Sequence, residues 1–182
     1  MSEYSDKELI TLFRNKENRN YAFNLIVRKY QERLYMHIRK IAIDHNDTDD
    51  ILQNTFIKAW KGLGNFREES RLYTWLYRIA TNEAFSFLKK KRTKFFLPII
   101  NVENQLINTL ENDNFLSGDE IQLKLQKAIL TLPDKQRVIF NMRYFDEMKY
   151  NEISEILNTS VGALKASYHH AVKKIEKYLK EN

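Results

Sequence analysis

The residues best suited to binding chemistry lie near the C-terminus, where a short amphipathic helix and a longer basic helix are predicted between Tyr150 and Lys174. Asn158-Thr159-Ser160 separates them, because Asn tolerates the left-handed backbone that ends many helices and Ser is a favourable N-cap. Two helices joined by so short a turn cross steeply, as in a helix-turn-helix. Small, polar and cationic side chains on the second helix suit the major groove and phosphates of DNA. These candidates are Ser160, Ala163, Lys165, Ser167, His169, His170, Lys173 and Lys174.

A second concentration of positive charge lies between Arg71 and Lys94, where seven Lys and Arg residues face the single acid Glu83. From residue 102 to 120 the balance inverts, with five acids and no Lys or Arg. This distribution predicts two nucleic-acid-binding modules and an acidic connector. The alternative, ordinary helices whose basic faces are only solvated, stays open at this point.

Composition narrows the class of protein. The 182 residues carry a net charge of +6, with a pI near 9.3, two Pro, four Gly and no Cys. Few turn residues and helical spacing of apolar residues predict an all-α fold. The absence of Cys excludes disulfides and thiolate metal sites and favours a reducing cytoplasm. Neither a signal peptide nor an apolar run long enough to span a bilayer is seen, so no membrane insertion is expected.

Motifs for catalysis are missing. The sequence has no phosphate-cradling Gly-rich loop, no HExxH and no GxSxG, and its four His lack ligand spacing. Helix capping explains the cluster of Asp47, Asp49 and Asp50 better than a metal does. We therefore expect no enzyme activity, no cofactor and no metal.

Apolar periodicity predicts six helices before the helix-turn-helix. Ser5 and Glu8 form a capping box for the first, Asp47 or Thr48 should cap the third, and Gly62 and Gly64 should end it. Residues 65–70 are predicted to form a loop, and residues 93–118 a mostly irregular linker with a helical turn near 102–110 and a cap at residue 117. The predicted helices span residues 6–14, 20–43, 49–61, 71–91, 119–130 and 134–145.

The fourth predicted helix has two distinct faces. One is a regular apolar stripe that includes Trp75, which we expect to be structural. The opposite face carries Thr74, Arg78, Asn82 and Phe85 at three- and four-residue steps. A Phe on a polar, cationic face is unusual and indicates a stacking role, as does Tyr73 nearby, although either could be a residue at the core boundary.

Three blocks of the sequence resemble those of a known family. Residues 48–60 (TDDILQNTFIKAW) resemble the region 2 helix with which sigma factors dock on core RNA polymerase. Residues 65–82 (NFREESRLYTWLYRIATN) resemble the segment that melts and reads the −10 element in the extracytoplasmic-function (ECF) subfamily. Residues 132–175 resemble region 4, the −35 reader. The resemblance covers nearly the whole chain in the expected order.

The resemblance implies two helical domains, residues 1–94 (region 2) and 119–182 (region 4), joined by a flexible linker, residues 95–118. It implies promoter-specific initiation with core polymerase, whose β′ and β subunits and promoter DNA would be partners. An anti-sigma factor, often membrane-anchored, would cover these surfaces. The implied core-binding residues are Asp49, Asp50, Leu52, Gln53, Phe56 and Trp60. The implied −10 residues are Asn65, Phe66, Arg67, Ser70, Tyr73, Thr74, Arg78, Asn82 and Phe85.

Some positions depart from the family pattern. Ser167 and His170 stand where many members carry Arg, which indicates a less G-dependent upstream element or more reliance on phosphates and DNA shape. Asn54 replaces a frequent acid in the docking block. Whether Trp60 is exposed or in the core stays open. The rival hypothesis is a conventional helix-turn-helix regulator that acts without core polymerase, with the residues before Thr93 as a sensor or dimerisation domain.

Overall fold

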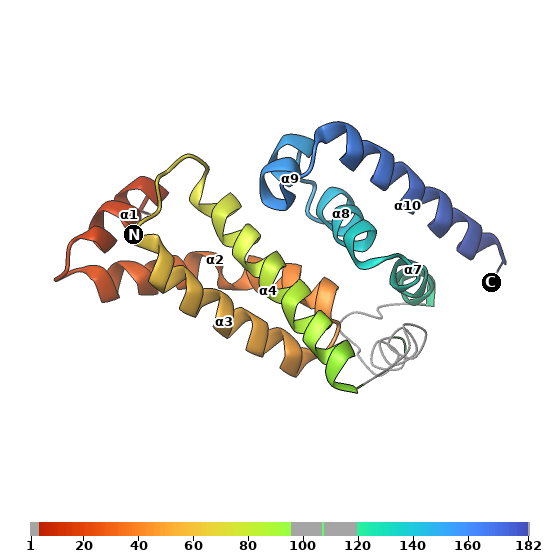
Figure 1. Ribbon diagram of the computed structural model, residues 1–182, viewed down its shortest axis with the longest axis horizontal. Helices are drawn as coiled ribbons and strands as arrows, with labels where there is room; N and C mark the ends of the chain where they lie inside the picture. The colour runs from red at the N-terminus through yellow and green to blue at the C-terminus, as the bar shows by residue number, and fades with distance from the viewer. Residues whose placement is uncertain (1–3, 96–106, 108–119, 182) are drawn as a thin grey trace.

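The chain folds as an all-α protein. The computed structural model describes residues 4–95, 107 and 120–181, and every regular element in these ranges is a helix (Figure 1). The N-terminal half is drawn in red to green and the C-terminal half in cyan to blue. The helices are α1 (Asp6–Arg14), α2 (Arg19–Ala42), α3 (His45–Leu63), α4 (Leu72–Phe95), α7 (Glu120–Leu130), α8 (Asp134–Tyr144), α9 (Tyr150–Leu157) and α10 (Val161–Glu181).

Most helix boundaries agree with the predictions, but the cap of α3 was predicted wrongly. The Ser5–Glu8 capping box is present at the start of α1. Helix α3 begins at residue 45 because Asp44, rather than Asp47 or Thr48, is the N-cap, and its Oδ1 accepts the backbone N–H of Asp47 at 2.9 Å. Thr48 is buried inside the first turn and donates its hydroxyl to the carbonyl of Asp44.

The predicted linker is largely outside the described residues. Helix α4 continues to Phe95, a little beyond its predicted end at residue 91. The predicted turn at residues 102–110, apart from Ile107, and the predicted cap at residue 117 lie outside the described ranges.

Helices α1 to α4 enclose one apolar core. It is built from residues that recur at helical spacing on all four helices, including Phe13, Ile26, Leu34, Ile51 and Leu76, none more than 1% exposed. The predicted stripe of α4 is confirmed for Leu72, Leu76, Ala80, Ala84 and Leu88, which are buried. Burial of this stripe fixes which face of α4 is left for function.

Helices α7 to α10 form the second half. Leu164, Ala171 and Ile175 of α10 are buried, as the predicted stripe requires. The ring of Tyr168 stacks on that of Phe140 with centroids 5.7 Å apart, which fastens α10 to α8. Asn158 has φ 47° and ψ 52°, so the predicted left-handed stop of α9 is confirmed.

The two halves pack against each other: α9 lies on α4, and α8 lies on α2. Val138, Met148, Ile153 and Ile156 of the C-terminal half belong to the same buried apolar cluster as the core of α1 to α4. The described parts of the two predicted regions thus share a hydrophobic seam, which the sequence did not reveal.

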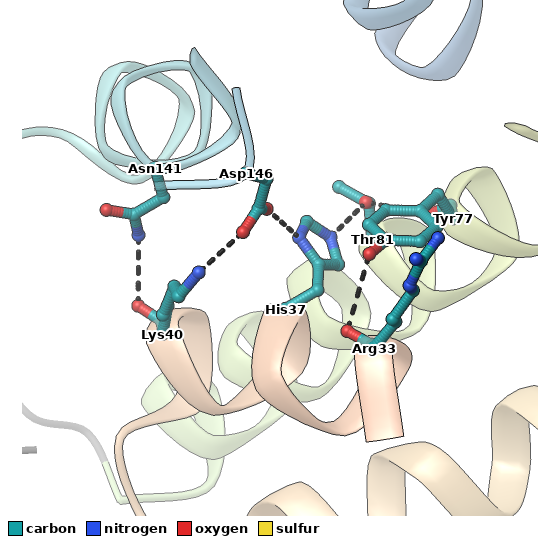
Figure 2. A network of polar contacts seen from close by, with 7 residues as sticks. All are labelled: Arg33, His37, Lys40, Tyr77, Thr81, Asn141 and Asp146. Atoms are coloured by element: carbon teal, nitrogen blue, oxygen red, sulfur yellow. Dashed lines mark hydrogen bonds and ion pairs between the residues drawn. The ribbon is translucent and has the colours of Figure 1, made fainter. Parts of the chain in front are cut away.

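A polar network centred on His37 joins the halves (Figure 2). The imidazole is 1% exposed, and its Nε2 lies 2.8 Å from Thr81 Oγ1 on α4. Its Nδ1 lies 3.6 Å from Oδ2 of Asp146, in the turn that follows α8. Lys40 donates to Asp146 Oδ1 at 2.5 Å, and the amide of Asn141 donates to the carbonyl of Lys40 at 3.3 Å.

The direction of one hydrogen bond follows from the donors available. Thr81 donates a hydrogen bond from its hydroxyl to the carbonyl of Tyr77, so its oxygen accepts a hydrogen bond from the N–H at His37 Nε2. Burial alone would raise the pKa of the Asp146 carboxyl, but His37 and Lys40 outweigh burial and hold that pKa below its usual 3.8.

The lowered pKa of Asp146 predicts a pH-dependent contribution to stability. Because the folded pKa lies below 3.8, the carboxylate stabilises the fold above that value and loses its effect as pH falls through the folded pKa. Asp146→Asn should lower the free energy of unfolding by about 1–2 kcal/mol at neutral pH. In urea unfolding of the full chain, the gap to wild type should be constant above about pH 5 and shrink towards about pH 3.

Glu181→Gln is the matched control, because Glu181 forms an exposed pair with Lys177 and should change stability little. A gap for Asp146→Asn that is the same at every pH would contradict the role assigned to its charge.

Candidate nucleic-acid interface

Helix α3 presents the residues predicted to dock on a partner. Asp49, Asp50 and Gln53 are exposed, while Leu52 and Phe56 are half-buried against the core. Capping by Asp44 starts α3 early enough to place both Asp residues within the regular helix. The result is a polar rim beside an apolar strip, which suits a helical partner.

Trp60 is neither free nor fully buried. Its ring makes edge contacts with Phe13 and Phe23, at centroid distances of 5.2 and 5.0 Å, and the Arg19 guanidinium lies 4.8 Å from it. These contacts give Trp60 a structural role, although its side chain remains partly exposed.

The loop at residues 65–70 is held in place by the packing of Phe66 and by hydrogen bonds from Arg14. Phe66 is only 7% exposed and packs on Trp75, with centroids 5.0 Å apart, so it does not point outward as a −10 contact would. Arg14 of α1 donates to the Phe66 carbonyl and to Glu68, both at 2.8 Å. Glu68 has φ 59°, a strained conformation that the Arg14 contact helps to hold.

The same loop exposes other predicted contacts. Asn65 and Arg67 are exposed and Ser70 is half-buried. With Phe66 as its anchor, the loop borders an open cavity of about 600 Å³ that is also lined by Ser70, Arg71 and Thr74. This volume is enough for an unpaired base.

The exposed face of α4 differs from the predicted one at Thr74, which is buried, and at Phe85, which is half-buried. Thr74 is 1% exposed, so its prediction as a surface residue that follows a DNA strand is wrong. It lies one residue before Trp75 on the side of α4 that packs on its neighbours. Asn82 is exposed, whereas Arg78 is half-buried and donates to the backbone carbonyl of Glu155 at 2.6 Å. Phe85 is half-buried against the core, at the boundary.

Tyr73 is also at the core boundary. Its ring lies 4.8 Å from that of Tyr77, and burial, with Glu152 and Asp146 nearby, raises the pKa of its phenol to about 12. The phenol therefore stays protonated at neutral pH and keeps a donor for a base or phosphate.

Helix α10 presents the second candidate surface. Ser160 caps it by accepting the N–H of Ala163 at 3.3 Å. The other predicted contacts leave the buried stripe: Ser167 is half-buried, and the exposed ones are Ala163, Lys165, His169, His170, Lys173 and Lys174. Small and cationic residues on the N-terminal part of a recognition helix are what a major groove admits.

Sequence reasoning missed three residues that organise these surfaces. Arg14 fixes the loop, and His37 and Asp146 link the halves. Arg14 is an ordinary basic residue at the end of α1, and His37 is a lone His on an apolar stripe. Neither pattern indicates contacts with residues 44 to more than 100 positions away. Within the described residues no cluster suited to a metal ion occurs.

Family models match both candidate surfaces. Residues 26–94 match "Sigma-70 region 2" and residues 122–175 match "Sigma-70, region 4". The RNA polymerase sigma-H factor of Pseudomonas aeruginosa is 30% identical over 98% of this chain and 96% of its own. The ECF RNA polymerase sigma factor SigW of Bacillus subtilis is 32% identical over 88% of this chain and 90% of its own.

This chain belongs to the ECF family of RNA polymerase sigma factors. As an ECF sigma factor it is a transcription initiation factor that works with RNA polymerase on promoters, rather than a conventional regulator. Its fold is also similar to that of CnrH in the structure of CnrH in complex with the cytosolic domain of CnrY, with a TM-score of 0.70 and 21% identity over 97% of this chain and 98% of that one. No helix in the described part of this sigma factor is long and apolar enough to cross a membrane.

Proposed function

We propose that this ECF sigma factor binds core polymerase through α3, captures the melted −10 element with α4 and its loop, and reads the −35 element with α10. The observation that carries this assignment is the presence of basic residues on both α4 and α10, in segments that match regions 2 and 4. Residues 1–94 and 119–182 would be the two functional regions.

The contact with core polymerase would use a different surface of the protein from the contacts with DNA. Asp49, Asp50 and Gln53 would form the polar rim of a contact with core polymerase, and Leu52 and Phe56 its apolar strip. Trp60 would contribute only its half-exposed part. This division would keep the contact with the β′ and β subunits, on α3, apart from the promoter contacts on α4 and α10.

An anti-sigma factor is a further proposed partner. Two similar folds, CnrH and the sigma factor RpoE from Bartonella quintana, are seen in complex with CnrY and with the anti-sigma factor NepR. Such a partner would cover the surfaces needed for polymerase, and the factor would act in the cytoplasm, where polymerase and DNA are found.

The function is tested by a pull-down with bacterial core polymerase and by run-off transcription from genomic fragments. We expect stoichiometric binding and initiation from a subset of fragments. Binding to duplex DNA without any binding to core would instead support the conventional regulator.

Arg78→Ala should weaken open-complex formation about tenfold while core binding is unchanged, because a charge-assisted contact to the melted strand is lost. Permanganate footprinting measures the melting and the pull-down measures docking. Arg28→Ala, an exposed cation on α2, is the control. Equal loss of melting and docking would make Arg78 a structural residue.

Lys165→Ala should chiefly weaken upstream contacts, because Lys165 is exposed one turn into α10. Removing one phosphate contact should lower the slope of log affinity against log salt by about 1. Lys177→Ala, at the far end of α10, serves as the control. An unchanged upstream footprint and salt slope would refute this assignment.

A further inference from the structure

The exposed face of α10 carries two parallel rows of side chains. Residues four apart lie one above another on a helix, about 6 Å apart along its axis. One row, which we call the cationic row, consists of Lys165, His169 and Lys173. The other, which we call the small row, consists of Gly162, Ala166, His170 and Lys174. Every residue of both rows is exposed, so both rows are open to contact with DNA.

The small row allows the N-terminal part of α10 to approach another surface closely. Gly162 has no side chain and Ala166 only a methyl group, and a Cβ placed at Gly162 would meet no atom within 4 Å. His170 is the first residue of this row whose side chain extends outward. In a major groove that admits the start of α10, His170 is therefore the side chain of this row that reaches a base edge.

A single His interrupts the cationic row. Lys165 and Lys173 flank His169, four residues away on either side, and both are exposed point charges suited to phosphates. A DNA backbone that contacts both Lys side chains passes over the imidazole between them. His169 is thus placed to face a phosphate.

Neither imidazole has an acidic partner. The two rings lie 6.1 Å apart, and within the described part of the chain neither forms an ion pair with an acid. On α10 itself, the charged residues within about one turn of them are the cations Lys165, Lys173 and Lys174. The charge of both rings is therefore left to solvent and to a bound ligand.

Helix α9 brings an aromatic ring, rather than an acid, towards this part of α10. The Lys165 ammonium lies 5.9 Å from the centroid of the Tyr150 ring, and the Arg143 guanidinium of α8 lies 5.3 Å from the same ring. The acids of α9, Glu152 and Glu155, line the cavity at the loop of residues 65–70 instead.

Helix α8 meets α10 through uncharged groups. Gln136 accepts a hydrogen bond from Lys174 at 3.3 Å, and Phe140 stacks on Tyr168. The acid of α8, Asp134, pairs with arginines of α4 and of its own helix.

Helix α7 also leaves the two imidazoles without an acid. Its buried contacts with α10 come from Ala128 and Ile129. The acid of α7, Glu120, is the first residue of that helix, more than two turns before these contacts.

We propose that His169 and His170 couple −35 binding to the uptake of protons. As pH falls, the sigma factor holds its upstream element more tightly, with a charged His169 against a phosphate and a charged His170 donating to a base edge. This inference rests on the proposed role of α10 as the −35 reader.

The coupling follows from the chemistry of imidazole. His is the side chain that ordinarily changes charge between pH 5 and 8. A phosphate favours the charged form of a group beside it, and the charged ring has two N–H donors where the neutral ring has one. Binding and protonation therefore favour each other. An Arg stays charged throughout this range, so His at residue 170 replaces a permanent cation with a proton-dependent one.

The test uses the full chain in complex with bacterial core polymerase and a duplex promoter fragment obtained by run-off transcription. Affinity is measured by fluorescence anisotropy at constant salt. The wild type should bind about tenfold more tightly at about pH 6 than at about pH 7.5. The same affinity at both values would overturn the proposal.

Two double variants separate these imidazoles from other titrating groups of the complex. His169→Gln with His170→Gln removes both, and the gain on acidification should fall to about twofold or less. His169→Lys with His170→Lys is the matched control with a fixed charge, and at about pH 7.5 it should bind nearly as tightly as the wild type does at about pH 6. A Gln variant that keeps the full gain, or a Lys variant no tighter than the Gln variant, would overturn the proposal.

Calorimetry counts the protons directly. When binding is titrated near pH 6.5 in two buffers of different ionisation enthalpy, the wild-type complex should take up roughly one to two protons more than the Gln variant. Equal uptake would contradict the coupling. All the substituted side chains are exposed, so circular dichroism should show the same helical fold in every variant at both pH values.

The roles of the two imidazoles differ in a selection from fragments with a randomised −35 element. Near pH 6, His170→Ala should relax the preference at one base position, whereas His169→Ala should weaken binding to all fragments alike. A uniform loss for His170→Ala would refute its contact with a base edge.

The proposed function and the proton coupling fail in different ways. If the wild type does not initiate transcription with core polymerase, or Lys165→Ala leaves the upstream footprint unchanged, the assigned role of α10 fails. If the wild type initiates and its footprint responds to Lys165→Ala, but the Gln variant keeps the pH dependence of the wild type, only the proton coupling fails.

Discussion

The buried imidazole of His37 is the contact on which the arrangement of the two halves depends. It lies on α2 and is buried from solvent. Its Nε2 forms a hydrogen bond with Thr81 on α4, and its Nδ1 faces Asp146 of the C-terminal half. A polar group at this depth needs partners. Nε2 has a hydrogen bond to Thr81, whereas Nδ1 approaches Asp146 at 3.6 Å without forming one. Because these two neighbours come from different halves, one side chain contributes both to the packing within the N-terminal bundle and to the docking of the second half upon it.

Around this contact the charges of the halves are complementary. Basic residues of α2 and α4 meet acids of α8, of α9 and of the turn between them, and apolar residues of both halves fill the space beneath. The exposed pairs add little stability by themselves. Their value is specificity, since they favour one register over other ways of stacking two helical bundles. A surface with cations for DNA is, for the same reason, a surface that acids within the chain can occupy.

The candidate surfaces show which kinds of position a sequence predicts well. On α10 the buried stripe and the polar face follow from spacing alone, and the structure confirms both, together with the stop at Asn158 and the cap at Ser160. On α4 the buried stripe was correct, but Thr74 was placed on the wrong face, because a helix packed on more than one side buries more than one stripe. Phe66 was taken for a loop contact, yet its ring packs on Trp75 and anchors the loop.

The sequence by itself determined the all-α class, most helix boundaries and the two basic stretches, because helical periodicity, caps and charge runs are local properties of the chain. The family followed from the resemblance of three blocks of the sequence. Only the tertiary structure decided that Arg14 holds the loop, that His37 joins Thr81 to Asp146, and that α9 lies on the face of α4 that carries Arg78. These contacts join residues dozens to more than a hundred positions apart. Their partners are chosen by shape and by the need to satisfy buried polar groups, which no short stretch of sequence specifies.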